Sequence, residues 1–113
     1  MLMSVTKPVV AQLAAYNSRN IVAFMVNFHD DCVCEDGDGN IFLNGKKAMY
    51  ESYQKMFEAS PDLRCTLVNR TVVGNWVFDE ERVTGRAGND GESHVMAIYK
   101  VENELITRVR FLR

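Results

Sequence analysis

The sequence predicts an α+β fold in which three helices precede a meandering antiparallel sheet. Two observations lead to this prediction. Before Leu63, apolar residues recur at intervals of three and four, which is typical of helices, whereas after Leu63 runs rich in valine, threonine and aromatic residues are separated by turn residues. The length of 113 residues suits one hydrophobic core, so we expect residues 1–113 to form a single domain.

Two helices are predicted in the first thirty residues. Ser4 or Thr6 can cap the first, and Pro8 suits its first turn, where a missing N–H costs nothing. The segment 17–20, Asn-Ser-Arg-Asn, interrupts the apolar spacing. The spacing resumes in residues 21–28, which predicts a second, shorter helix.

A short strand and a third helix follow. Residues 32–35 indicate a brief strand, and the Gly- and Asp-rich segment after them indicates a loop. Asn44 can cap the third helix, which we expect to run from about Lys46 to Ala59 and to end at Ser60-Pro61.

A first hairpin is predicted from residues 64–73 and 76–86, because Gly74-Asn75 between them is a two-residue turn signal. This turn fixes a register. It places Val73 opposite Trp76, Val72 opposite Val77, Arg70 opposite Asp79, and Val68 opposite Glu81.

A second hairpin is predicted from residues 93–101 and 105–112 around Asn103-Glu104. Its expected register places Val101 opposite Ile106, Tyr99 opposite Arg108, and Ala97 opposite Arg110. One face of this hairpin would then carry Val95, Ala97, Tyr99, Arg108, Arg110 and Leu112, and the other would carry Met96, Ile98, Val109 and Phe111.

Composition narrows the possible partners and the compartment. Hydrophobic residues at 47% and charged residues at 25% are ordinary for a globular protein, and the net charge of −2 comes without a basic cluster, so we expect neither nucleic acid nor membrane as a partner. The opening residues lack a signal-peptide pattern. Three cysteines, with one isolated C-x-C pair, predict free thiols, no metal site and a cytoplasmic protein.

Short motifs along nearly the whole chain resemble a known family. They are Tyr16-Asn17-Ser18-Arg19-Asn20, Phe28-x-x-Asp31, Asn44-Gly45-Lys46-Lys47-Ala48, Tyr53, Ser60-Pro61-Asp62-Leu63, the run from Asn69-Arg70 to Gly85, and Tyr99-x-Val101. In this order and spacing they are similar to the SnoaL-like, ketosteroid-isomerase-like branch of the nuclear transport factor 2 superfamily. The resemblance implies a cone-shaped, cystatin-like curved sheet wrapped around three helices.

The resemblance also implies roles for individual residues. Asp36 matches the proton-shuttling aspartate of ketosteroid isomerase, and Tyr53 matches a tyrosine that supports its pocket. The two oxyanion donors of that enzyme correspond to Gln12 and Ala97 here, and without such a donor pair the enolate loses its main electrostatic stabilisation. Classical steroid isomerisation is therefore not expected.

Asp36 has two interpretations. At the lip of an apolar pocket, desolvation would make its carboxylate a better base near neutral pH. Alternatively, it belongs to a polar turn, where an aspartate accepts hydrogen bonds from nearby backbone N–H groups.

The two arginines of the second hairpin also have two interpretations. In the family alignment, Arg108 and Arg110 face the cavity and favour an acidic ligand. By polarity alone, the more apolar opposite face would turn toward the helices and the arginines toward water. We follow the family alignment and expect ligand contacts from Tyr16, Phe28, Tyr53, Phe57, Ala97, Tyr99, Arg108 and Arg110.

The pair Arg70 and Asp79, with Glu81 two residues on, is the third ambiguous feature. Inside the cone it would be a polar cluster that handles ligand, because buried ion pairs are rarely net stabilisers. As an ordinary cross-strand pair it would contribute roughly 0.2 to 1 kcal/mol. The ordinary pair is the simpler expectation.

Two functions follow from these patterns. The first is a cofactor-free proton-transfer enzyme of the isomerase, cyclase or dehydratase type, with Asp36 as base and an apolar ligand bearing a carbonyl or acidic group. The second is a module that binds such a ligand without transforming it, or that serves to dimerise. For either, we expect a homodimer through the face formed by Met96, Ile98, Val109 and Phe111.

Overall fold

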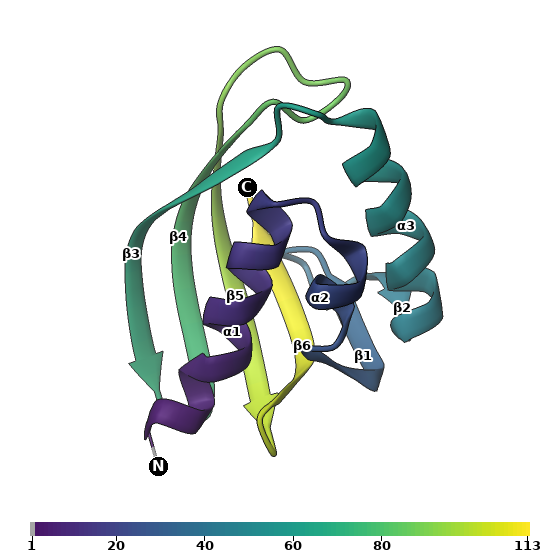
Figure 1. The fold of residues 1–113 in the computed structure, drawn as a ribbon. Coiled ribbons are helices and arrows are strands. Elements are labelled where there is room, and N and C mark those ends of the chain that lie inside the picture. The colour runs from purple at the N-terminus through teal and green to yellow at the C-terminus, as the bar shows by residue number, and fades with distance from the viewer. Residues whose placement is uncertain (1) are drawn as a thin grey trace.

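The computed structural model describes residues 2–113 and confirms the α+β fold, with three helices and six strands in that part of the chain (Figure 1). The elements are α1 (Leu2–Asn17), α2 (Ile21–Met25), β1 (Phe28–Glu35), β2 (Ile41–Asn44), α3 (Lys46–Ala59), β3 (Arg64–Val73), β4 (Trp76–Thr84), β5 (Ser93–Glu102) and β6 (Leu105–Leu112).

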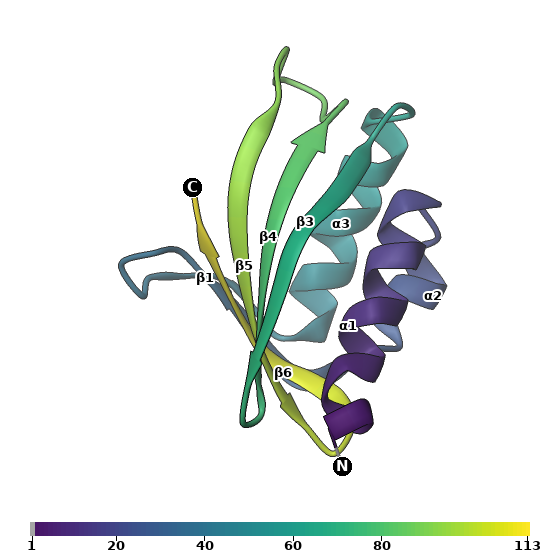
Figure 2. The ribbon, with the colours of Figure 1, turned by 90° about the vertical axis from the view of Figure 1, so that its left-hand side faces the viewer.

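The six strands form one curved sheet in the order β2-β1-β6-β5-β4-β3. Every neighbouring pair is antiparallel except β1 and β6, which run parallel. Figure 2 shows all three helices on one side of the sheet, and the β1–β2 loop projecting on the opposite side. The side chains that alternate toward the helices therefore define the interior of the protein.

The hairpin of β3 and β4 has the predicted register near its turn. Gly74 adopts a φ of 59°, and Val73 pairs with Trp76, Val72 with Val77, and Arg70 with Asp79. Farther from the turn a bulge shifts the register, so that Glu81 pairs with Leu67 and not with Val68 as predicted. The extra residue is in β3, so β4 alternates without interruption and keeps both Asp79 and Glu81 buried on its inner face.

The hairpin of β5 and β6 departs from prediction after its first pair. Val101 pairs with Ile106 as expected, but a bulge then places Arg108 opposite Lys100. Tyr99 consequently pairs with Val109, Ala97 with Phe111, and Ile98 with Arg110. A shift of one residue exchanges the two faces of a strand, so the predicted division of this hairpin into two faces is wrong along β6.

The helices begin and end close to where the sequence indicates. Helix α1 begins at Leu2, earlier than predicted, and so contains Pro8 in its interior. Asn20 caps α2, and its side-chain oxygen accepts a hydrogen bond from the Ala23 N–H at 3.1 Å. Helix α3 has the predicted bounds, but Gly45 is its N-cap, because Asn44 is the last residue of β2.

The core lies between the helices and the inner face of the sheet. Phe24 is at its centre, with ring centroids of Tyr16, Phe28, Tyr53 and Phe57 between 4.7 and 6.1 Å away. The three cysteines are buried and free. Aromatic packing of this kind joins α1, α2 and α3 to the start of β1 and fixes the helices over the sheet.

Candidate functional site

A cavity of about 360 Å³ lies between the helices and the inner face of the sheet. Its size falls within the usual range for small-molecule sites. Most of its lining is apolar or aromatic, and the polar and charged members are Gln12, Tyr16, Ser52, Tyr53, Cys65, Glu81, Arg86, Asn89, Ser93, Tyr99 and Arg113. Glu81 is the single acidic residue among the described residues that line the cavity.

Glu81 reaches the cavity because it lies two residues after Asp79 and four after Val77 on β4, so that all three share the inner face. Glu81 is only 5% exposed. Burial raises the pKa of the Glu81 carboxyl to about 7, and the negative charge of Asp79 adds to this, while a hydrogen bond with Cys65 and the charge of Arg70 act in the opposite direction. Glu81 can therefore both accept and release a proton near neutral pH.

Asp79, the neighbour of Glu81 on the same face, is paired with Arg70. The Arg70 Nε donates to Oδ1 at 2.7 Å and Nη2 donates to Oδ2 at 2.9 Å. The Asp79 side chain is fully buried. Arg70 and Asp79 are therefore the cross-strand pair of the simpler expectation, although the Asp79 carboxylate is buried. Neither residue lines the cavity, and a role of the pair in handling ligand stays a prediction.

Three tyrosines bring hydroxyl groups to the same cavity. The Tyr99 hydroxyl accepts a hydrogen bond from Gln12 Nε2 at 3.1 Å, and Tyr16 and Tyr53 line the opposite, helical side. Burial raises the pKa of all three phenols. They therefore remain protonated and can donate hydrogen bonds to a ligand oxygen.

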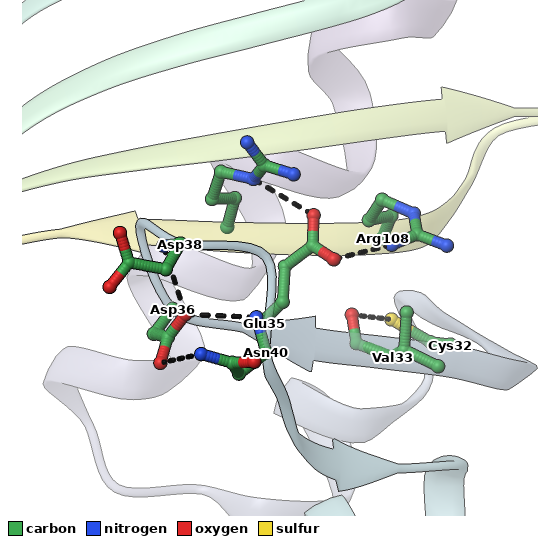
Figure 3. A network of polar contacts seen from close by, with 8 residues as sticks. Cys32, Val33, Glu35, Asp36, Asp38, Asn40 and Arg108 are labelled. Carbon is green, nitrogen blue, oxygen red and sulfur yellow. Dashed lines mark hydrogen bonds and ion pairs between the residues drawn. The ribbon is translucent and has the colours of Figure 1, made fainter.

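Asp36 does not line this cavity. It lies in the loop after β1, where Figure 3 shows it beside Asp38 and Asn40. Its Oδ1 accepts hydrogen bonds from the backbone N–H groups of Asp38 at 3.0 Å and Asn40 at 2.9 Å. These bonds, the Asn40 bond foremost, lower the pKa of the Asp36 carboxyl. The polar-turn interpretation therefore describes its surroundings, and the predicted apolar pocket around Asp36 is wrong.

Arg108 and Arg110 also lie away from the cavity, on the outer face of the sheet. Arg108 Nη1 donates to Glu35 Oε2 at 2.6 Å and Arg110 Nε donates to Glu35 Oε1 at 2.9 Å, and Figure 3 shows the Glu35–Arg108 contact beside the Asp36 loop. The prediction that the two arginines face the ligand is wrong because of the bulge between β5 and β6.

Because of the same bulge, the four residues predicted to form a dimer surface are divided between the two faces of the sheet. Val109 is 1% exposed and, with Phe111, lines the cavity, whereas Met96 and Ile98 are on the other side of the sheet. The four residues do not form one outer face. The homodimer itself stays a prediction.

The remaining ligand residues divide into two groups. Tyr16, Phe28, Tyr53 and Tyr99 line the cavity, and their contact with a ligand stays a prediction. Phe57 and Ala97 are buried in the core beside it and do not line it. In residues 2–113 no group of three or more histidine, cysteine or acidic side chains can hold a metal ion, and none of the helices described there is long and apolar enough to cross a membrane.

Of the three charged residues of the cavity, Glu81 was predicted only as a member of a possible internal cluster, and Arg86 and Arg113 were not predicted at all. Glu81 had a signal, because alternation from the apolar Val77 places it on the buried face of β4. Arg86 lies in the loop after β4, and Arg113 follows β6. Neither arginine belongs to a periodic pattern, so the sequence held no comparable sign of where they point.

Comparison with known proteins agrees with this architecture. The SnoaL-like domain model matches residues 9–109. An uncharacterised cystatin-fold protein from Novosphingobium aromaticivorans has 23% identity and a TM-score of 0.88, with 96% of this chain and 97% of that chain covered. No curated protein matches the sequence.

Two further solved structures illustrate the range of proteins with this fold. A protein described as a putative polyketide cyclase from Sinorhizobium meliloti has 17% identity, a TM-score of 0.79 and 92% coverage of both chains. An epoxide hydrolase from M. tuberculosis has 16% identity and a TM-score of 0.82, with 97% of this chain and 82% of that chain covered. Identities this low establish the shared fold alone.

Proposed function

Because this chain belongs to the SnoaL-like domain family and has one acidic group among the described residues of its cavity, we propose that it is a cofactor-free acid–base enzyme. It transfers a proton on a small, largely apolar carbonyl compound, and Glu81 is the base. The position of Glu81 carries the proposal: its carboxyl is buried, faces the cavity and has a pKa of about 7. A base with a pKa near the working pH is the most effective one.

In the first chemical step, the Glu81 carboxylate takes a proton from the carbon next to the substrate carbonyl. The C–H bond breaks, an O–H bond forms on Glu81, and the electron pair becomes the C=C bond of an enolate whose charge rests on oxygen. Return of the proton to another carbon gives an isomer. Attack of the enolate on a second carbonyl closes a ring, and the proton held by Glu81 passes to the new alkoxide oxygen. When the carbon next to the enolate carries a hydroxyl group, the electron pair instead expels that group, which leaves as water with the proton from Glu81 and gives a dehydration product.

The enolate oxygen needs hydrogen-bond donors in a place from which water is excluded. The Tyr99 hydroxyl lies on the inner face of β5, and its oxygen already accepts a hydrogen bond from Gln12, so its own O–H is available to donate. Tyr16 and Tyr53 offer two more donors from the helices. A substrate between helices and sheet can thus have its carbonyl held on one side while Glu81 acts on the neighbouring carbon.

The base role passes from Asp36 to Glu81 for a geometric reason. A base must come within hydrogen-bond reach of the proton it removes. Asp36 lies outside the cavity, and two backbone N–H groups occupy its Oδ1. The putative polyketide cyclase among the fold neighbours is in keeping with a reaction of this class.

Deuterium exchange of 2-tetralone tests the proposal. The exchange of its C1 protons in D₂O, followed by proton NMR, reports carbonyl-directed proton abstraction directly. We expect the wild type to accelerate exchange above the buffer rate, Glu81→Gln to reduce that acceleration by about a hundredfold, and the matched variant Asp36→Asn to retain it. Equal rates for the wild type and Glu81→Gln would refute the proposal and favour a module that binds ligand without transforming it.

A further inference from the structure

We propose that the substrate of this site carries an anionic group, a carboxylate in the simplest case, which Arg86 and Arg113 bind at one end of the cavity. The remaining part of the substrate is apolar and lies among the aromatic side chains. That the bound molecule is a substrate rests on the proposed function. The anion site itself rests only on the two arginines.

The first step of the argument is the charge of the lining. Arg86 and Arg113 are the two basic residues among the described residues that line the cavity, and Glu81 is the single acidic one. Arg86 comes from the loop between β4 and β5, and Arg113 follows β6. Two segments far apart in the sequence thus supply guanidinium groups to one cavity, and guanidinium groups match the planar geometry of a carboxylate.

The second step is that these guanidinium groups are available. The arginines within β4 and β6 all have a carboxylate partner: Arg82 pairs with Glu92, and Arg108 and Arg110 pair with Glu35. Neither Arg86 nor Arg113 forms an ion pair with a described residue. Arg113 is instead positioned over the ring of Phe111, another lining residue, at 5.4 Å from its centroid.

The third step is that the positive charges of Arg86 and Arg113 act on groups that line the cavity. Burial raises the pKa of the Tyr16 and Tyr53 phenols, and the positive charges of Arg86 and Arg113 act against that rise at both. Both arginines are therefore close enough to the two tyrosines to affect a charge placed there. An anion between them gains from both charges while Glu81, the acidic residue, meets the uncharged part of the ligand.

The backbone before Arg86 fixes the direction of its loop. Gly85 has a φ of 75°, and a Cβ at this position would collide with the carbonyl of Asp62, at the end of the segment that follows α3. Ser60 adds a second tie, because its hydroxyl accepts a hydrogen bond from the Ala87 N–H at 2.9 Å. The two residues on either side of Arg86 are thus held against the segment that joins α3 to β3.

Calorimetric titration with 2-naphthoate and its neutral analogue 2-naphthamide tests the anion site. We expect the wild type to bind 2-naphthoate at least about tenfold more tightly than 2-naphthamide. Arg86→Gln and Arg113→Gln should each weaken 2-naphthoate binding by about tenfold and leave 2-naphthamide binding unchanged. Lys55→Gln removes the same charge from an exposed position of α3 that does not line the cavity, and it should bind as the wild type does.

Equal affinities for the two compounds in the wild type would overturn the inference, as would a double Arg86→Gln, Arg113→Gln variant that still prefers 2-naphthoate. Failure to bind 2-naphthoate at about 1 mM would overturn it too. Glu81→Gln separates this result from the proposed function. It should keep the preference for 2-naphthoate while losing 2-tetralone exchange. The anion site and the base role of Glu81 can therefore be refuted independently of each other.

Discussion

Arg70 and Asp79 form a bidentate ion pair between β3 and β4, with N–O distances of 2.7 and 2.9 Å. The Asp79 side chain is fully buried, and that of Arg70 is 19% exposed. A carboxylate without water depends on its partner for stabilisation. This pair therefore places a fixed negative charge beside Glu81, where it adds to the effect of burial on the Glu81 pKa.

We predict that Arg70→Gln destabilises the protein by about 3 kcal/mol, because it leaves the Asp79 charge buried and uncompensated. Arg82→Gln is the matched control in the same sheet. It breaks the exposed pair with Glu92, whose side chains are 46% and 50% exposed, and should cost less than about 1 kcal/mol. Urea unfolding at pH 7 measures both, and equal losses would show that Arg70 does not support Asp79.

Glu81 should make the protein less stable as the pH rises. Its pKa is about 7 in the folded protein and 4.5 ordinarily, so between these values the folded state holds a proton that the unfolded state has lost. The favourable contribution of Glu81 is complete below pH 4.5 and is lost as the pH passes 7. The shift corresponds to about 3 kcal/mol.

Glu81→Gln should remove this loss, because glutamine remains neutral at every pH. The difference in unfolding free energy between Glu81→Gln and the wild type should therefore shift in favour of the variant from pH 4 to pH 8. Urea unfolding at both pH values gives that difference directly. A difference that does not change with pH would mean that the folded protein holds Glu81 as an ordinary exposed carboxyl.

The position of Arg108 and Arg110 on the outer face has its own consequence. Arg108→Gln and Arg110→Gln should each leave both 2-tetralone exchange and 2-naphthoate affinity within about twofold of the wild type. Each variant leaves Glu35 with one guanidinium partner, so the outer cluster persists. A tenfold loss of 2-naphthoate affinity in either variant would instead support the register without the bulge.

Gly85 should be far less tolerant of substitution than Gly88. Both have positive φ, but only at Gly85 would an added Cβ meet other atoms, those of the Asp62 backbone. We expect Gly85→Ala to cost about 3 kcal/mol or more and Gly88→Ala about 1 kcal/mol. Thermal unfolding distinguishes them. Similar midpoints would contradict the close contact between this loop and the segment after α3.

Much of the fold could be predicted because its signals are local. Helix α3 was bounded correctly by its apolar spacing and by Ser60-Pro61, and Gly74-Asn75 set the first hairpin and the pairing of Arg70 with Asp79. The parallel pairing of β1 with β6 brings together segments more than seventy residues apart. No local pattern specifies such a contact, so it could not be predicted from the sequence.

The site was harder to predict because it depends on which face of each strand turns inward. One extra residue in β6 moved Arg108 and Arg110 to the outside and Val109 and Phe111 to the cavity. The bulges of the described strands contain no glycine that would mark them in the sequence. Glu81 was found as a member of a possible internal cluster, but its importance became visible only when the helices were seen to cover its side of β4.

The pH dependence of 2-tetralone exchange tests the central claim most directly. If the Glu81 carboxylate is the base, the rate above buffer should rise through a single midpoint near pH 7 and then level off, because only the deprotonated form accepts a proton. Asp36→Asn should give the same curve. A midpoint near pH 4, or a curve that persists unchanged in Glu81→Gln, would contradict the account.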